Sequence, residues 1–140
     1  MDIEGCLREG YLKRVRPDRA EIEKELMESA DDLDMARSSC EAQKYKWATV
    51  QAYYSMFHAA RSVLLSLGLK ERRHYAIEVV LRELVTERKL EERYLDDFKA
   101  AMYCREDADY GSVYSMGKAQ SLLEVAEEFN DKMRALGNIR

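Results

Sequence analysis

The stretch YCREDADYG, residues 103–111, carries the residue types best suited to chemistry in this chain. Arg105 and Asp109 are four residues apart, so on a helix their side chains lie within reach of each other on one face. Tyr110 follows directly, and Gly111 allows the helix to end there. An arginine in this setting can bind a phosphate or another anion, with Tyr110 as a hydrogen-bond donor. The alternative, which the spacing alone favours, is a structural ion pair that closes a helix end beside a core tyrosine.

The apolar face of the helix that leads into this stretch places Arg105 on the packed side. Phe98, Ala101 and Met102 follow helical spacing, and the same face continues to Arg105. A guanidinium charge that is buried without a partner is costly, so it needs a carboxylate or several carbonyl oxygens. Asp109 is the partner that the spacing offers.

One lone histidine and one basic turn are the remaining candidates. His58 lies in the apolar stretch YYSMFHAAR, where a histidine is usually a hydrogen-bonded core or interface residue; as a general base it would need an orienting partner that the sequence does not identify. The basic turn KERRHYA contains Arg72, Arg73 and His74. It is either a solvated loop or a patch that contacts the phosphates of a nucleotide or RNA. Glu71 in the same turn weakens the second interpretation.

The sequence offers no metal-binding or cofactor-binding motif. Cys6, Cys40 and Cys104 are widely spaced, form no CxxC pair and are accompanied by only two histidines. Glycine-rich phosphate loops, the dinucleotide-binding fingerprint, HExxH and GxSxG are absent. The adjacent acids Asp31 and Asp32 diverge on a helix, so both are expected to face solvent. We therefore expect no metal ion and no cofactor.

Composition is typical of one soluble, helix-rich domain that spans residues 1–140. The chain is 46% hydrophobic and 36% charged, with one proline and six glycines. Its net charge of −4 argues against a general nucleic-acid binder but allows a local basic patch. The apolar runs are interrupted well before the roughly 20 residues that a transmembrane helix needs, and no secretion signal begins the sequence. A cytoplasmic protein without a membrane partner is expected.

Hydrophobic periodicity predicts five helices after a mixed lead-in of residues 1–16. Their approximate ranges are 17–40, 46–67, 73–87, 91–108 and 115–136. No strand-like alternation is found. The second helix is apolar around most of its circumference, which marks it as central. The predicted fold is all-α, an antiparallel up-and-down bundle of four or five helices.

The second predicted helix also carries a seam of small residues that would let another helix approach closely. The seam consists of Ala48, Ala52, Ser55, Ala59, Ser62 and Ser66. It favours a homodimer, because a second copy could pack against it.

The order of these features resembles the HEPN superfamily of small all-α domains. MESADDLDMAR resembles the first long helix of that family, ATVQAYYSMFHAARSVLLSLG its second helix, and RHYAIEVVLREL the helix after it. REDADYG resembles the Arg-x-x-Ala-Asp-Tyr-Gly signature of one poorly characterised subgroup. The resemblance covers nearly the whole chain.

Many HEPN domains are metal-independent ribonucleases in which an arginine is followed, after four to six residues, by a histidine. Two such motifs meet across a homodimer. Arg105 matches the arginine, but Tyr110 stands at the first permitted histidine position and no histidine follows at the other two. His58 and His74 have no arginine at the required upstream distance. The ribonuclease motif is therefore absent, and a phenol, with an ordinary pKa of about 10, would need a large downward shift to act as a base.

The resemblance implies a non-catalytic HEPN-type binding module that forms a homodimer. Such a module would pair with a small nucleotidyltransferase in a toxin–antitoxin-like system, or bind a nucleotide or RNA phosphate through Arg105, Asp109 and Tyr110. The accessory candidates are His58, Arg72, Arg73 and His74. One alternative is a divergent ribonuclease that uses Arg105 and Tyr110 at the dimer interface. Another is a helical scaffold in which Arg105 and Asp109 only hold a helix end.

Overall fold

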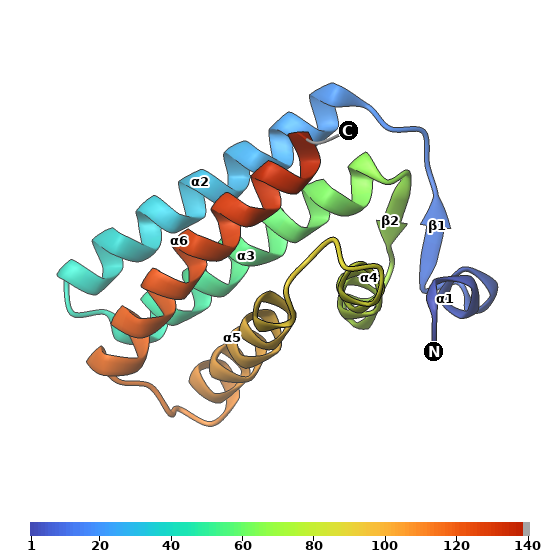
Figure 1. Cartoon of the computed structure of the whole chain (residues 1–140). Helices are drawn as coiled ribbons and strands as arrows, with labels where there is room; N and C mark the ends of the chain where they lie inside the picture. Colours follow the sequence, from blue (N-terminus) through green and yellow to red (C-terminus); the bar gives the residue numbers. More distant parts are fainter. Residues whose placement is uncertain (139–140) are drawn as a thin grey trace.

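The structure is a computed structural model that describes residues 1–138, in which six helices and two short strands are found (Figure 1). In chain order they are α1 (Ile3–Glu9), β1 (Leu12–Arg14), α2 (Arg19–Glu41), α3 (Tyr45–Ser66), β2 (Leu69–Glu71), α4 (His74–Thr86), α5 (Glu92–Tyr110) and α6 (Met116–Asn138). The all-α bundle is confirmed, and the five predicted helices correspond to α2 through α6 with bounds that differ by at most two residues.

The lead-in is more ordered than its sequence indicates. Helix α1 begins after Asp2, whose carboxylate accepts a hydrogen bond from the Gly5 N–H at 2.8 Å, a standard N-terminal cap. The helix ends at Gly10, where φ is +80° and a side chain would be strained. The mixed lead-in of residues 1–16 therefore contains a capped helix.

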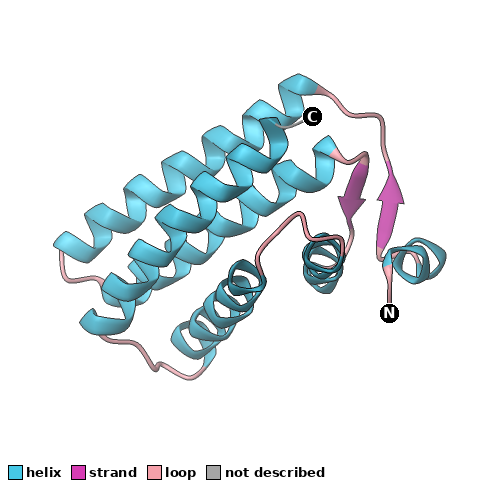
Figure 2. Cartoon of the chain, in the orientation of Figure 1, coloured by secondary structure: helices cyan, strands magenta, loops and turns pink. Residues whose placement is uncertain are grey.

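The two strands correct the expectation that the chain has no β-structure. β1 and β2 pair antiparallel, with Leu12 opposite Glu71 and Arg14 opposite Leu69 (Figure 2). Leu12 and Leu69 are 1% and 4% exposed and attach the pair to the core. Strands of three residues are too short to show alternation in a sequence, which is why the pattern did not reveal them. We call this two-stranded unit the ribbon.

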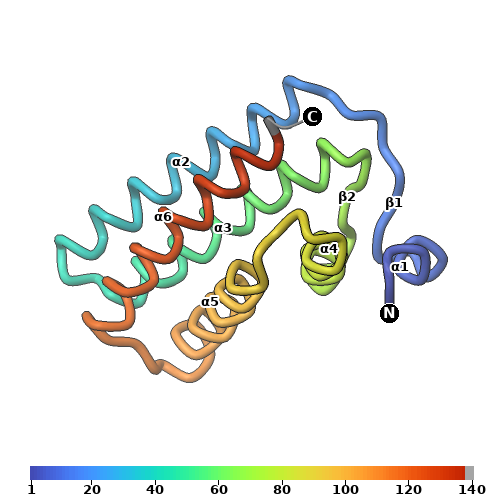
Figure 3. Tube along the Cα trace, viewed as in Figure 1, coloured from blue at the N-terminus to red at the C-terminus, as the bar shows by residue number. Residues whose placement is uncertain are grey.

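Helix α3 is the centre of the molecule. It packs most extensively against α2 and α6, which run alongside it, and α5 packs on it as well (Figures 1 and 3). Tyr53 on α3, Phe98 on α5 and Phe129 on α6 are fully buried, and the last two rings stack with centroids 5.8 Å apart. The prediction that this helix is central is confirmed.

The small-residue seam of α3 is occupied within the chain. Ala52 and Ala59 are completely buried. At Ser55, the hydroxyl of Ser29 on α2 donates to the backbone carbonyl at 2.7 Å, and Nδ2 of Asn130 on α6 donates to the side-chain oxygen at 3.2 Å. The seam therefore lets α2 and α6 approach α3, so it gives no support to a homodimer, which stays a prediction.

Among the described residues, no helix combines the length and the apolar character that crossing a membrane requires.

Candidate functional site

Arg105 lies near the C-terminal end of α5, with its guanidinium turned toward α3. Its side chain is 18% exposed, as the apolar face of the helix predicts. Nη2 donates a hydrogen bond to the hydroxyl of Tyr54 at 2.9 Å. Nε lies 3.1 Å from Oδ2 of Asp109, so the ion pair that the spacing predicts is present. Nε is nevertheless buried and its alignment with the carboxylate does not make a hydrogen bond.

Three tyrosine rings surround this guanidinium. Its Cζ lies 5.4 Å from the ring centroid of Tyr54 and 5.8 Å from those of Tyr53 and Tyr110. These distances suit cation–π attraction, which orients the arginine. Tyr110 is 78% exposed, so its ring leaves most of its surface to solvent beside the charge. Among the described residues Nη1 of Arg105 makes no hydrogen bond, so it is available as a donor.

His74, the first residue of α4, joins this site through Tyr53. Its Nδ1 lies 3.3 Å from the Tyr53 hydroxyl, and Tyr53 in turn contacts Arg105. Burial raises the pKa of Tyr53 to about 12. Part of His74 faces solvent, but its ring packs on Phe57 with centroids 4.6 Å apart. This partial burial, helped by the charge of Arg105, lowers the pKa of His74, so its imidazole is neutral at pH 7.

The sequence indicates His74 only as an accessory residue and does not single out Tyr53 or Tyr54. These residues are separated from Arg105 by 31 to 52 positions, and no local spacing connects them. The only signal in the sequence is the concentration of tyrosines on the central helix, which is equally typical of a core.

The basic turn before α4 is more strongly cationic than expected. Arg72 and Arg73 are exposed, and Cζ of Arg73 lies 5.1 Å from the ring centroid of Tyr11. Glu71 points inward: its side chain is 6% exposed and its Oε2 lies 2.6 Å from Nη2 of Arg61. The expectation that Glu71 weakens the patch was therefore wrong, because its charge is paired with Arg61.

His58 belongs to a different cluster, between α3 and α2. Its Nδ1 lies 2.6 Å from Oε2 of Glu25, and its Nε2 lies 3.6 Å from Oδ2 of Asp32. Arg61 adds a contact from Nη1 to Oε1 of Glu25 at 3.3 Å. Burial raises the pKa of Glu25, but the hydrogen bond from His58 and the charge of Arg61 outweigh it, so the net shift of this pKa is downward.

Asp32 corrects a second expectation. Its side chain is 30% exposed rather than fully solvated, and burial raises its pKa although His58 opposes the shift. His58 thus has two carboxylate partners from α2 that the sequence could not identify. Because these contacts run to α2 and not to α5, His58 lies in a cluster separate from the Arg105 site.

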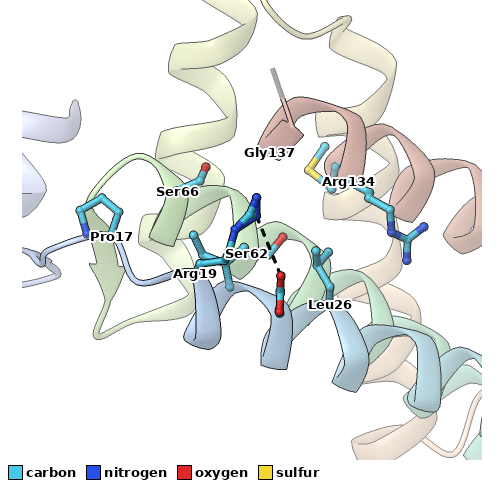
Figure 4. Close-up of a pocket in the computed structure, with 10 residues that line it drawn as sticks. Pro17, Arg19, Leu26, Ser62, Ser66, Arg134 and Gly137 are labelled. Atoms are coloured by element: carbon cyan, nitrogen blue, oxygen red, sulfur yellow. Dashed lines mark ion pairs between the residues drawn. The ribbon is translucent and has the colours of Figure 1, made fainter. Parts of the chain in front are cut away.

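A pocket of about 590 Å³ lies elsewhere, where the start of α2 meets the ends of α3 and α6 (Figure 4). It contains none of the predicted site residues. Its two arginines are engaged, Arg19 with Glu23 at 3.9 Å and Arg134 with Asp131 at 3.4 Å. Across residues 1–138, no group of three or more histidine, cysteine or acidic side chains is arranged to hold a metal ion.

Comparison with known proteins identifies relatives of this chain. The chain is 28% identical over 116 residues to a "UPF0332 protein" of Archaeoglobus fulgidus, covering 81% of this chain and 93% of the relative. It is 29% identical over 118 residues to "Putative toxin MJ0605" of Methanocaldococcus jannaschii, covering 83% of this chain and 88% of that one.

A solved structure, TT1696 from Thermus thermophilus, superposes with a TM-score of 0.71 at 17% identity. The superposition covers 82% of this chain and 97% of that one, and at this identity the likeness concerns the fold alone. The sequence description of the HEPN domain matches residues 22–136, from the first turn of α2 almost to the end of α6 and across the whole Arg105 site. The chain belongs to the HEPN domain family.

Proposed function

We propose that this HEPN domain is a binding module that recognises a phosphate group of a nucleotide or RNA at Arg105. One observation carries the proposal: the guanidinium is fixed in place by three tyrosines and Asp109, yet its donors are mostly unused. Of its five N–H donors, only one from Nη2 makes a hydrogen bond within the described residues, to Tyr54. A phosphate oxygen pair on Nη1 and Nη2 would complete the bidentate geometry that arginine favours.

The surroundings of Arg105 support an anionic ligand that carries a base. The exposed ring of Tyr110 offers a stacking surface, and base–aromatic stacking contributes about 1–3 kcal/mol per base. Arg72 and Arg73 add positive charge beside His74. Asp109 offsets part of the charge of Arg105, which favours a ligand with more than one negative charge over a single carboxylate.

Toxin–antitoxin-like pairing is the context that the comparisons support. Two Methanocaldococcus jannaschii relatives carry the name "Putative toxin", at 29% and 23% identity. By family resemblance, the partner protein in this proposal is a small nucleotidyltransferase. The surface for that partner, or for a second copy of the chain in a homodimer, would be the exposed apolar side chains where α5 passes into α6. These are Tyr103, Tyr110, Val113, Tyr114 and Met116, each 46% to 78% exposed.

Binding measurements on an arginine variant and a matched control test the phosphate site. Arg105→Ala should weaken binding of ATP and of a short single-stranded RNA by at least about tenfold, because a charge-assisted bidentate contact contributes over 1.4 kcal/mol. Arg93→Ala is the control, because Arg93 lies on the same helix and makes the same two kinds of contact. It donates a hydrogen bond to a tyrosine hydroxyl at 2.7 Å and pairs with the carboxylate of Glu128 at 3.3 Å. Thermal unfolding is recorded for both variants.

Two outcomes would reject the phosphate site. Equal binding by Arg105→Ala and Arg93→Ala would show that the ligand binds at another site. No binding by the wild type, with early melting of Arg105→Ala only, would make Arg105 a structural residue and leave a protein partner as the function.

One observation favours a second candidate, a divergent ribonuclease. His74 brings a neutral imidazole into the Arg105 site from α4, although the linear motif is absent. A neutral histidine can accept the proton of a ribose 2′-hydroxyl, and Arg105 can stabilise the phosphate charge. This candidate predicts RNA cleavage in EDTA that disappears in Arg105→Ala and in His74→Asn, with Tyr110→Phe as a further test. Cleavage that survives all three substitutions would assign the activity to another site or a contaminant.

A further inference from the structure

Two lysines face each other across the ribbon. Lys13 on β1 is directly opposite Lys70 on β2, and both side chains are exposed. Like charges directly opposite on neighbouring strands destabilise the pair. Neither lysine has a carboxylate partner within the described residues. The ribbon therefore carries an uncompensated charge that its own folding does not require.

The ladder of the ribbon continues beyond the three paired positions and adds a third cation to the same face. The Arg72 N–H donates to the Tyr11 carbonyl at 2.8 Å, and the Val15 N–H donates to the Gly68 carbonyl at 2.9 Å. Because side chains alternate along a strand, Arg72 and Tyr11 lie on the same face as the two opposed lysines.

On the opposite face of the ribbon Arg14 is exposed and pairs with Glu4, but the rest of this face is buried. It carries Leu12, Leu69 and the carboxylate of Glu71, which is paired with Arg61. The only acid of the paired strands is thus withdrawn from the outer face. The result is a two-sided element whose core side is mainly apolar and whose outer side carries basic side chains and no acid from the paired strands, although the chain as a whole has a net charge of −4.

Basic side chains extend this face at both ends. A groove of about 500 Å³ adjoins Lys13 and Lys70 and contains Arg16, which is exposed and without a carboxylate partner among the described residues. Of the two acids in that groove, Asp18 is engaged as the N-terminal cap of α2, where it accepts from the Ala20 N–H at 2.9 Å. We call the resulting surface the basic face of the ribbon. It consists of Lys13, Arg16, Lys70, Arg72 and Arg73.

This basic face leads directly to the Arg105 site. Arg73 stacks over Tyr11 of the ribbon, and the next residue is His74, which reaches the Tyr53 hydroxyl beside Arg105. The basic face therefore ends beside a residue of the Arg105 site, His74, which is itself exposed. A mononucleotide at Arg105 would leave the basic face unused.

We propose that the basic face of the ribbon binds the phosphate backbone of single-stranded RNA and directs that strand to Arg105. This inference rests on the proposed function for its endpoint, and it names the ligand class as a polynucleotide rather than a free nucleotide. A row of unpaired cations next to a half-exposed tyrosine, Tyr11, is the combination that single-strand binding surfaces use. The contacts are to the backbone, so they carry affinity and salt dependence but no base specificity.

A pair of double variants tests the basic face. Lys13→Gln with Lys70→Gln removes two charges from the ribbon. The control is Lys24→Gln with Lys118→Gln, which removes two charges from exposed lysines of α2 and α6. These lysines likewise have no carboxylate partner within residues 1–138, and both double variants have the same net charge. The probe is a fluorescein-labelled single-stranded RNA of about 20 nucleotides with mixed sequence, titrated by anisotropy at several salt concentrations. Circular dichroism verifies that both variants are folded.

The expected result is a change in salt dependence for the ribbon variant alone. Each phosphate contact contributes about 0.7 to the slope of log K against log salt, so losing two lowers the slope by about 1.4. A fourfold rise in salt weakens RNA binding in both proteins, and the fold-loss of the ribbon variant would then be about seven times smaller than that of the wild type. Equal slopes and affinities for the ribbon variant and its control would overturn the proposal, and would leave an acidic protein surface as the partner of the basic face.

Adding Arg105→Ala and ATP separates this inference from the proposed function. If ATP binding depends on Arg105 but RNA binding is unchanged in the ribbon variant, the proposed RNA contact of the basic face is rejected and the phosphate site at Arg105 is retained. RNA binding that depends on the ribbon but not on Arg105 keeps the basic face and rejects its endpoint.

Discussion

Replacing Glu71 with glutamine tests the contact that holds the ribbon to the central helix. The carboxylate accepts hydrogen bonds from Nε and Nη2 of Arg61, the shorter at 2.6 Å, and the Glu71 side chain is only 6% exposed. Glu71→Gln keeps the size of the side chain and removes its charge. Arg61 is then left with Glu25 as its only carboxylate partner, at 3.3 Å.

The expected loss of stability follows from the burial of this pair. Removing one partner of a fully buried ion pair costs about 3–5 kcal/mol, because the other charge stays buried without compensation. The Arg61 side chain is 25% exposed and keeps one carboxylate, so we expect the free energy of unfolding to fall by about 2 kcal/mol. For a domain of this size, that corresponds to a decrease in Tm of roughly 8 °C.

Urea unfolding followed by far-UV circular dichroism measures this difference. Glu4→Gln is the control, because the Glu4–Arg14 pair has a similar distance, 3.2 Å, but side chains that are 71% and 68% exposed. That change should lower the free energy of unfolding by less than about 0.5 kcal/mol. Equal free energies for the two variants would refute the reasoning. The double variant Arg61→Met with Glu71→Leu should be more stable than Glu71→Gln, since it removes both charges of the pair while Glu25 keeps His58 as a partner.

Three further changes follow from the same structure. Lys13→Glu places a carboxylate opposite Lys70 and should raise the free energy of unfolding by about 0.2–1 kcal/mol while weakening RNA binding, which chemical unfolding and anisotropy measure on one sample. The lowered pKa of Glu25 contributes stability that is complete above the ordinary pKa of about 4.5 and is lost as the pH falls through the pKa of the folded protein. Glu25→Gln should therefore make the free energy of unfolding less dependent on pH below about 4.5, which urea unfolding at several acidic pH values measures. The pKa of His74 is lowered in the folded protein, so the unfolded chain takes up a proton at a higher pH than the folded one. The free energy of unfolding should therefore decrease as the pH falls from 7 to 5. His74→Asn should remove part of this decrease, which unfolding measured at both pH values will show. A pH profile of His74→Asn identical to that of the wild type would contradict this reasoning.

The long helices could be predicted because each carries its apolar periodicity within its own sequence. The helix that ends at Tyr110 is an example: Phe98 and Ala101 are fully buried where the pattern placed them, and Arg105 follows on the same face. The pair of Arg105 and Asp109 could be predicted for the same reason, since both residues lie on one helix.

The remaining features depend on contacts between segments that are distant in sequence. Nothing near His58 indicates that Glu25 and Asp32 of another helix will flank it, 33 and 26 positions away. Glu71 looked like an exposed acid in a basic turn until its register in β2 placed it opposite Leu12 and facing Arg61. In each case the side chain was visible in the sequence, but the direction in which it points was set by the tertiary fold.

The position of the small-residue seam has a consequence for how relatives of this chain can diverge. On one side of α3, Ala52 and Ala59 leave no room for a larger side chain, so a substitution such as Ala52→Leu would force neighbouring helices apart. On the side that bears α4, α5 and the ribbon, the residues proposed to contact ligand are exposed or partly exposed to solvent. Selection for a stable fold and selection for a new ligand therefore act on opposite sides of one helix, and the binding side can change its chemistry while the architecture is inherited unaltered.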